Sequence, residues 1–562
     1  MHDDPKSPEP SLGRRAFLGR TGAAAVGLGV AGFPAVEGLG AGSTEALGGV
    51  GDSRGPDGAP PSLELTEVSL AEMAVAISSG RWTSRMLVEG YLDRIERIDR
   101  RGPTINSILE VNPDALALAD ALDQELREKG SRGPLHGIPV LVKDNIGTGD
   151  RMHTSAGSLA LADFRAPEDA FVVRKLRDAG CVILGKSNMS EWANARGRAS
   201  IGGWSGRGRL SRNPFMLDRS PGGSSSGTAA AVSANLVAAA LGTETMGSIV
   251  SPASLCGVVG MKPTVGLLGR TGIIPISFTQ DTAGPMGRTV RDAAILLSAM
   301  AAPDPSDAAT AQVPQRVADY TAYLDPDALR GARIGVARSS FGLSLHADRV
   351  AERAIETLRG AGAVLVDPVE LPEAGIIWSF DSEVLSYELK ASLNAWFQGP
   401  GRGSAMRSLA DLIEFNLRHS DQELAWFGQE TFLYAQEKGP LTSPQYLNAL
   451  SMVRRFSRDE GIDAAVRQYR LDALVAPTQS PAWLMDVLLG DNSVLGSCVL
   501  PAAAGYPSIS VPAGDVSELP VGLLFMGPAW SEGKLLGYAF AFEQRTRARR
   551  SPSFLPTIEA RP

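Results

Sequence analysis

The 562-residue chain carries 54 lysine and arginine residues against 62 aspartate and glutamate residues, a formal net charge of −8. Hydrophobic residues make up 44% of the sequence and charged residues 21%, which is typical of a globular protein with a large core. The acidic balance argues against a nucleic-acid partner, and beyond the N-terminus no apolar run is long enough to span a bilayer.

The N-terminal residues are typical of a targeting signal. The pair Arg14-Arg15 precedes the letters AFL and an apolar stretch, residues 23–36, that is too short for a membrane span. This arrangement looks like a twin-arginine signal, and the alternative is a helix with two chance arginines. We expect a signal peptide over residues 1–42 and a flexible linker over 43–61, rich in Gly, Ser and Pro. The signal implies export to a periplasmic or extracellular location, without stable membrane insertion after its removal.

Three amphipathic helices are expected next. Ser69 and Glu72 have the spacing of a capping box, and the letters LAEMAVAI continue with helical periodicity. Residues 84–99 form a second helical pattern. Residues 113–130 form a third, which Gly130 closes.

From residue 138 the pattern changes to short apolar runs that are typical of buried strands. These runs cover residues 138–143, 181–186, 474–478 and 508–513, and residues 170–180 form a helical pattern between the first two. Alternation of buried strands and helices predicts an α/β domain with a largely parallel sheet.

No break in composition divides residues 62–562, so we expect a single catalytic domain there. No repeat has a fixed period. Residues 377–450 combine aromatic residues with mixed helical patterns and predict a helical excursion that covers one face.

Two motifs suggest other chemistry. The letters GCVILGKS, residues 180–187, match a phosphate loop, but the residues between the glycines read as a strand rather than a loop. The letters GSSSG, residues 223–227, fit a nucleophile elbow centred on Ser225, which requires a preceding strand and a later histidine. A turn-rich segment precedes this motif instead.

Histidine and cysteine are scarce. No pair of the five histidines has metal-ligand spacing, and His346 and His419 lie in polar helical contexts without a paired carboxylate, so a Ser-His-Asp triad and a metal site are both disfavoured. The five histidines are His2, His136, His153, His346 and His419. The three cysteines are an odd, sparse set that makes no disulfide framework, and two of them lie in apolar runs; they are Cys181, Cys256 and Cys498.

A lysine is the alternative base. Lys143 ends the apolar strand 138–143, and ligands of α/β sheets gather at the carboxyl ends of strands. Burial there disfavours the ammonium ion and lowers its pKa, so that a neutral amine becomes possible. The other interpretation is a strand-end lysine that reaches water.

Two serines lie in tight, small-residue segments. Ser224 lies in a Gly/Ser turn that opens an alanine-rich helix, residues 220–242, although a simple helix cap would also explain this turn. Ser248 follows Gly247 in the letters LGTETMGSIVSPAS, where small residues allow the backbone to approach a ligand.

Taken together these segments resemble the amidase signature family, the Ser-cisSer-Lys hydrolases. The resemblance extends over about residues 65–550, and the letters GTETMGSI with GIIPISFTQDTAGPM are most similar to peptide amidases. It implies an α/β amidase-signature fold: a central, mostly parallel mixed sheet with helices on both faces. The matching segments follow the family's order; they are 137–145, 183–193, 220–232, 241–264, 280–290 and 519–536.

The resemblance implies three catalytic residues. Lys143 matches the base, Ser224 matches a bridging serine that follows a cis peptide bond, and Ser248 matches the nucleophile. Neutral Lys143 would take a proton from Ser224, which would take one from Ser248. Ser248 would attack the amide carbonyl to form an acyl-enzyme, Ser224 would protonate the leaving amine, and water would release the acid.

The resemblance also places an oxyanion hole at the backbone N–H groups of Thr245, Met246, Gly247 and Ser248. Met246 departs from the family, which has Gly there, or Asp in peptide amidases. If the position needs a positive φ, methionine would strain the turn. Otherwise we expect its side chain to line the pocket. Glu244, which peptide amidases share, marks the subgroup.

These features predict an exported, cofactor-free and metal-free amidase that cleaves a linear amide, with C-terminal peptide amides as the first substrate class. An aryl or acyl amide is the alternative within the family. Three alternatives lie outside this activity: a non-catalytic binding protein of the same fold, one component of a glutamine amidotransferase, and a phosphate-loop NTPase. The sequence leaves the substrate and the oligomeric state open.

Overall fold

The computed structural model describes residues 63–342, 344–493 and 496–559. The predicted signal peptide, residues 1–42, and the predicted linker, residues 43–61, lie outside the described residues. The helices are α1 (Leu70–Ser78), α2 (Ser84–Arg94), α3 (Ala115–Lys129), α4 (Phe171–Asp178), α5 (Ser226–Ser233), α6 (Val250–Leu255), α7 (Val290–Met300), α8 (Leu345–Gly360), α9 (Ala374–Gln398), α10 (Leu409–Arg418), α11 (Ser420–Glu423), α12 (Glu430–Gln436), α13 (Pro444–Arg454), α14 (Asp463–Tyr469), α15 (Val499–Ala504) and α16 (Glu532–Thr546).

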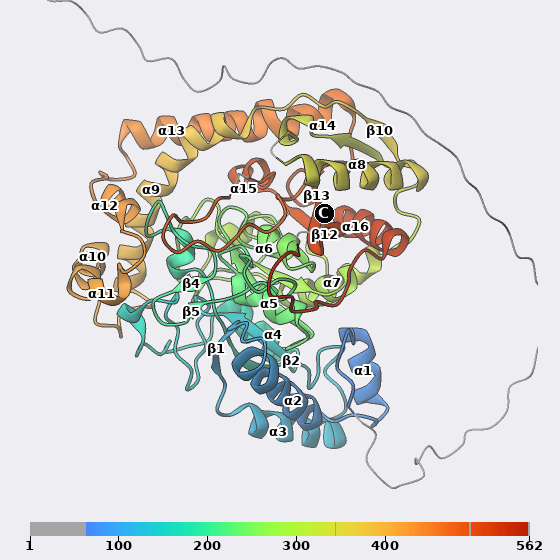
Figure 1. Cartoon of the computed structure of the whole chain (residues 1–562), viewed down its shortest axis with the longest axis vertical. Helices are drawn as coiled ribbons and strands as arrows, with labels where there is room; N and C mark the ends of the chain where they lie inside the picture. The colour runs from blue at the N-terminus through green and yellow to red at the C-terminus, as the bar shows by residue number, and fades with distance from the viewer. Residues whose placement is uncertain (1–62, 343, 494–495, 560–562) are drawn as a thin grey trace, which may run out of the picture. The chain divides into compact units, whose positions relative to one another are not determined.

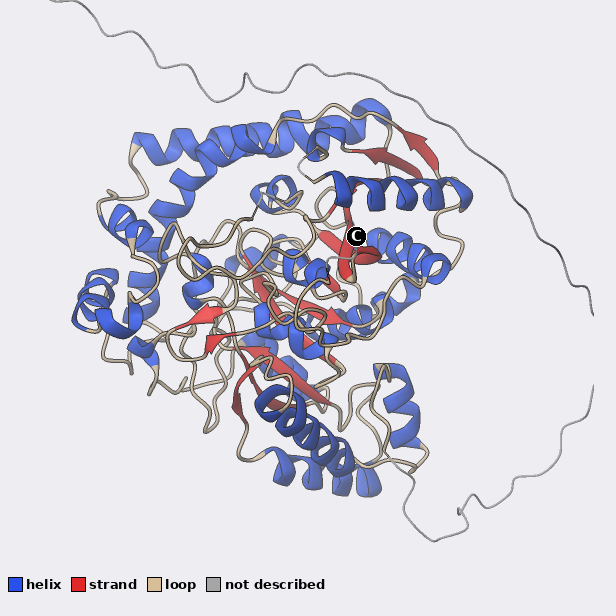
Figure 2. Ribbon diagram, viewed as in Figure 1, coloured by secondary structure: helices blue, strands red, loops and turns tan. Residues whose placement is uncertain are grey.

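The strands form one large sheet and a two-stranded ribbon of β4 and β5 (Figures 1 and 2). They are β1 (Ile108–Val111), β2 (Pro139–Lys143), β3 (Val182–Ser187), β4 (Trp204–Ser205), β5 (Arg209–Leu210), β6 (Ala239–Glu244), β7 (Val259–Lys262), β8 (Thr282–Gly287), β9 (Arg333–Val336), β10 (Val364–Val366), β11 (Ala473–Pro477), β12 (Ser508–Val516) and β13 (Leu519–Met526).

The three N-terminal helices are confirmed. The Ser69 side chain and Glu72 form the expected capping box on α1. The second helix differs in its last turns, because α2 ends at Arg94 and the chain continues as a π-helix over Ile95–Arg101. Gly130 ends α3 with a positive φ of 83°, as its place after the last periodic residue predicts.

The four predicted strands are confirmed as β2, β3, β11 and β12, within two or three residues at their ends. The strand order is β1-β3-β2-β6-β8-β7-β12-β13-β11-β9-β10. The sheet is mixed, as expected, although six of its ten neighbouring strand pairs are antiparallel and four are parallel. Parallel pairing occupies two blocks, β3-β2-β6 and β11-β9-β10, and antiparallel pairing occupies the middle and the β1 edge. Because β2 and β6 are parallel neighbours, their carboxyl ends lie at the same edge of the sheet.

Two groups of helices flank the sheet. Helices α5 and α6 pack on β6, β7 and β13, whereas α7, α8 and α16 pack together and against β8 and β12. The helices predicted for residues 377–450 are also confirmed: residues 374–454 form α9 to α13, drawn in yellow and orange in Figure 1. Within the described parts of the chain, no helix has the length and apolar character needed to cross a bilayer.

Close packing in the sheet gives a stability prediction. A Cβ at Gly284, in the middle of β8, would lie 2.1 Å from the Met261 carbonyl oxygen and 2.8 Å from Ile249 Cδ1. We expect Gly284→Ala to lower the free energy of unfolding in urea by about 1–3 kcal/mol, because backbone must shift. Gly375→Ala, in the exposed first turn of α9 with no atom within 4 Å of the new Cβ, is the control. An equal loss in both variants would contradict the packing argument.

Candidate active site

A strand end and two turns bring the predicted catalytic residues to one edge of the sheet. Lys143 is the last residue of β2, Ser224 lies two residues before α5, and Ser248 lies in the turn between β6 and α6. All three are buried or nearly so: the exposed fraction is 0% for Lys143 and Ser224 and 7% for Ser248. The parallel pairing of β2 with β6 explains why segments about 100 residues apart in sequence meet here.

The Lys143 amine makes three contacts. Its Nζ lies 2.8 Å from Ser224 Oγ, 2.9 Å from Thr243 Oγ1 and 3.1 Å from the Thr243 carbonyl oxygen. A neutral amine has two N–H donors and one lone pair. If the two N–H groups bond to Thr243, the lone pair remains for the Ser224 hydroxyl proton. Asn145 Nδ2 donates to Thr243 Oγ1 at 3.0 Å and supports this arrangement.

Burial sets the protonation state of this amine. It lowers the pKa of Lys143 to about 7, while the carboxylates of Glu244 and Asp281 act in the opposite direction. The neutral amine is therefore accessible to Lys143 near neutral pH. The alternative interpretation, a strand-end lysine that reaches water, is wrong because the side chain is fully enclosed.

The turn that carries Ser224 is fixed by backbone contacts. The peptide bond between Gly223 and Ser224 is cis, as the resemblance implies. The Ser224 carbonyl oxygen accepts from the Ser190 N–H at 3.1 Å, and the next residue, Ser225, donates its N–H to the Ser248 carbonyl oxygen at 3.1 Å. The structure thus brings Lys143 and Ser224 into side-chain contact and attaches the Ser248 turn to the same loop through its backbone.

The Ser248 hydroxyl makes no hydrogen bond among the described residues. Its link to Ser224 is therefore not closed in this structure. Hydrogen bonds between catalytic groups are often long without substrate and tighten in the complex.

The turn before Ser248 presents free backbone donors. Among the described residues, no intramolecular hydrogen bond uses the N–H groups of residues 245–248. Gly247 carries the positive φ in this turn, 77°, whereas Met246 does not have a positive φ. Met246 therefore does not strain the backbone. Its half-buried side chain packs against an apolar cluster that includes Val250 and Cys498, and it does not line the cavity described below.

Two acidic residues shape this turn, although the motifs alone predict no catalytic or positioning role for either. Glu244 Oε2 accepts from the N–H groups of Ile249 and Val250 at 2.7 and 3.1 Å, which fixes the start of α6. Asp281 Oδ1 accepts from Thr245 Oγ1 at 2.6 Å. Burial raises the pKa of Asp281 to about 6. Both residues lie inside segments that match the family, so their place in those segments was the available signal.

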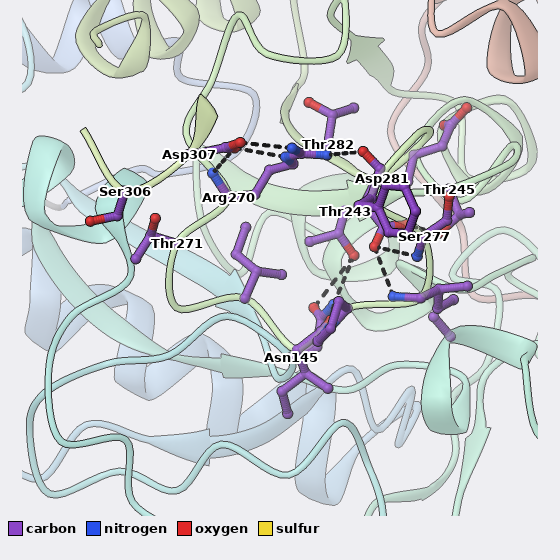
Figure 3. Close-up of a pocket in the computed structure, with 17 residues that line it drawn as sticks. Asn145, Thr243, Thr245, Arg270, Thr271, Ser277, Asp281, Thr282, Ser306 and Asp307 are labelled. Atoms are coloured by element: carbon purple, nitrogen blue, oxygen red, sulfur yellow. Dashed lines mark hydrogen bonds and ion pairs between the residues drawn. The ribbon is translucent and has the colours of Figure 1, made fainter. Parts of the chain in front are cut away.

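A cavity of about 230 Å³ adjoins the strand end Thr243–Thr245 (Figure 3). Asn145 and Thr243 lie at its base, and Arg270 stands at one side in a two-pronged contact with Asp307, with nitrogen–oxygen distances of 2.7 Å. The remaining wall is mostly apolar and comes from residues 273–278. The cavity thus offers an apolar surface that reaches the predicted oxyanion hole at Thr245, whereas Lys143, Ser224 and Ser248 do not line it.

The competing motifs are resolved by the same structure. The phosphate-loop letters fall on β3, as the strand interpretation predicts, and Lys186 Nζ bonds to Thr154 Oγ1 at 2.9 Å. No strand leads directly into Ser225, because residues 211–225 contain none, and Ser225 Oγ donates to the Thr243 carbonyl oxygen at 3.0 Å. Among the described residues no histidine is hydrogen-bonded to Ser224, Ser225 or Ser248, and His153 Nδ1 lies 3.1 Å from Glu110 Oε1.

Comparison with known proteins agrees with this geometry. The family model described as Amidase matches residues 86–536. A probable amidase of Arabidopsis thaliana is 40% identical over 504 residues, which cover 88% of this chain and 93% of the relative. A putative amidase of Schizosaccharomyces pombe is 36% identical over 522 residues, which cover 88% of each chain.

Solved structures show the same similarity. The native peptide amidase of Stenotrophomonas maltophilia superimposes with a TM-score of 0.83 and 52% sequence identity, covering 87% of this chain and 99% of that chain. A second structure of a peptide amidase contains the competitive inhibitor chymostatin, with the same TM-score, identity and coverage. The expected fold class is therefore confirmed.

Proposed function

This chain belongs to the amidase family and is an amidohydrolase that acts on carbon–nitrogen bonds, and we propose that it cleaves linear amides through Lys143, Ser224 and Ser248. The observation that carries this proposal is the fully buried Lys143 amine, 2.8 Å from the Ser224 hydroxyl and with a pKa of about 7.

The first half of the reaction forms an acyl-enzyme. Neutral Lys143 accepts the Ser224 hydroxyl proton while Ser224 accepts the Ser248 proton, and Ser248 Oγ forms a bond to the amide carbon. The carbonyl oxygen becomes an oxyanion within reach of the free N–H groups of residues 245–248. Ser224 then donates its proton to the amide nitrogen as the C–N bond breaks, and the Lys143 ammonium returns a proton to Ser224.

The second half restores the enzyme. Ammonia leaves, and a water molecule occupies its place beside Ser224. Lys143 is neutral again, so it accepts the Ser224 proton while Ser224 accepts a proton from the water, whose oxygen attacks the acyl carbon. The bond to Ser248 Oγ then breaks, Ser224 donates a proton to Ser248, the Lys143 ammonium returns one to Ser224, and the carboxylic acid is released.

We propose C-terminal peptide amides as the substrate class, supported by the 52% identity to the peptide amidase. The test is ammonia release from a panel of peptide C-terminal amides, beside release of nitroaniline from a p-nitroanilide and of ammonia from a fatty acylamide. We expect the peptide amides to be turned over fastest and chymostatin to inhibit competitively, as it does the relative. Faster turnover of the p-nitroanilide or the fatty acylamide would mean that this compound, and not a peptide amide, represents the substrate class. No turnover of any amide would refute the proposal.

We further propose that the protein is exported, supported by Arg14-Arg15 and the apolar stretch that follows. The test is cell fractionation of the full chain and of a variant with both arginines changed to lysine. Export of the parent chain and cytoplasmic retention of the variant are expected. Equal distribution of the two would contradict the twin-arginine route.

A further inference from the structure

The apolar wall of the cavity continues into a segment that is bonded on both of its sides. This segment, residues 276–281, is called the wall segment below. On its inner side Asp281 Oδ2 accepts from the N–H groups of Ile276 and Ser277 at 2.7 and 2.8 Å, and Asp281 Oδ1 accepts from the Thr245 hydroxyl. The wall segment is thereby joined to the strand end that precedes Ser248.

On its outer side the wall segment is bonded to helix α9 through Glu388. The Glu388 carboxylate accepts from the Ser277 hydroxyl, from the Thr279 hydroxyl at 2.9 Å and from the Thr279 N–H at 3.3 Å. A fourth donor, the Tyr446 hydroxyl of α13, lies 2.8 Å away. Glu388 is 0% exposed, and it does not line the cavity.

A second carboxyl group on the same face of α9 extends this contact. Asp381, seven residues before Glu388, accepts a hydrogen bond from the Gln280 side-chain amide and is also fully buried. Side chains of Ser277, Thr279 and Gln280 therefore all donate to α9, while Asp281 points to the sheet. Burying the Glu388 carboxylate is costly unless its hydrogen bonds are satisfied, so its contacts favour the one wall conformation that presents its donors. Asp381 adds a single contact, since its second oxygen has no partner among the described residues and burial raises its pKa to about 7.

We propose that Glu388 is a positioning residue that fixes the wall segment and thereby sets which acyl-side residue the enzyme accepts. This inference rests on the proposed function. When ammonia is the leaving group, every side chain that the enzyme can select lies on the acyl side of the scissile bond. The cavity would take that residue's side chain.

The cavity indicates an uncharged, bulky apolar side chain. Its volume of about 230 Å³ exceeds that of a cavity of about 150 Å³ that holds benzene. Ile273, Ile274 and Ile276 supply apolar surface, and the Arg270 cation is already paired with Asp307. Peptides ending in phenylalaninamide should therefore be preferred over those ending in glycinamide.

The test compares Glu388→Ala with Glu383→Ala. Glu383 lies on the same helix and accepts from Lys438 Nζ and the Tyr434 hydroxyl, but it does not contact the wall segment. Two quantities are measured: amide hydrogen exchange of the wall segment, residues 276–281, and kcat/KM for phenylalaninamide and glycinamide peptides. We expect Glu388→Ala to speed the exchange and to reduce the preference for phenylalaninamide by roughly tenfold or more, chiefly through KM. Glu383→Ala should change neither quantity.

Tyr446→Phe provides a second test in case Glu388→Ala misfolds. It removes the hydroxyl that donates to Glu388 and keeps the packing of the ring. It should reduce the preference by roughly fivefold or less, in the same direction. Unchanged exchange in Glu388→Ala, or an equal loss of activity on both substrates, would overturn the inference. If the parent chain hydrolysed no amide, the proposed function would fail, and the exchange data alone would decide whether Glu388 positions the wall.

Discussion

Replacing Ser248 by alanine is expected to reduce kcat for amide hydrolysis by roughly 10⁴-fold or more, with little change in stability. The side chain is nearly buried, makes no hydrogen bond among the described residues and follows a turn with free N–H donors. Its removal therefore deletes the nucleophile and leaves the surrounding contacts in place. The measurement is single-turnover and steady-state ammonia release on the best peptide amide.

The control is Ser251→Ala, a hydroxyl one turn further along the chain in α6 that makes no described side-chain hydrogen bond. It should keep the activity of the parent chain within a factor of about three. Turnover that persists in Ser248→Ala would mean that another group attacks the amide. Ser225→Ala would then be the next variant, because that serine is the other candidate nucleophile.

The second large effect concerns pH and Lys143. We expect kcat/KM to rise with pH through about 7 and then to level off, because only the neutral amine can accept a proton from Ser224. Below the pKa the ammonium predominates and activity falls tenfold per pH unit. Lys143→Met should lower kcat/KM by roughly 10²- to 10⁴-fold and should abolish the rising limb of the pH profile, the increase in kcat/KM near pH 7. The measurement is a kcat/KM profile between pH 5 and 9.

Asp281→Asn tests the origin of that limb. The Asp281 carboxylate stabilises the ammonium form and raises the pKa of Lys143, so its removal should move the limb to lower pH. A flat profile in the parent chain, or a limb that stays in Lys143→Met, would show that another group is titrated.

Much of this site could be predicted because its residues lie in continuous motifs. The run 138–143 is apolar on both faces, which indicates a buried strand and places Lys143 at its end. Ser224 and Ser248 stand in glycine-rich turns whose letters match the family closely. Local patterns also fixed the first helices, including the capping box of α1.

The remainder depends on contacts between distant segments. Glu388 lies 111 residues from Ser277, and nothing in the helical periodicity of α9 marks it as different from its neighbours. Strand direction could not be predicted either. An apolar run of five residues looks the same in a parallel or an antiparallel pair, so the sequence did not indicate the antiparallel middle of the sheet. The place of the Met246 side chain depends on a cluster that includes Cys498, about 250 residues away.

The position of the helical segment in the chain has an evolutionary consequence. Helices α9 to α13 lie between β10 and β11, and both of these strands flank β9 at one end of the sheet. The lysine and both serines come from earlier residues, at the other side of the sheet. A lineage can therefore exchange residues 374–454 as a cassette without interrupting strand order. The same exchange would replace Asp381 and Glu388, the partners of the wall segment on α9. Substrate preference could then change while Lys143, Ser224 and Ser248 stay the same.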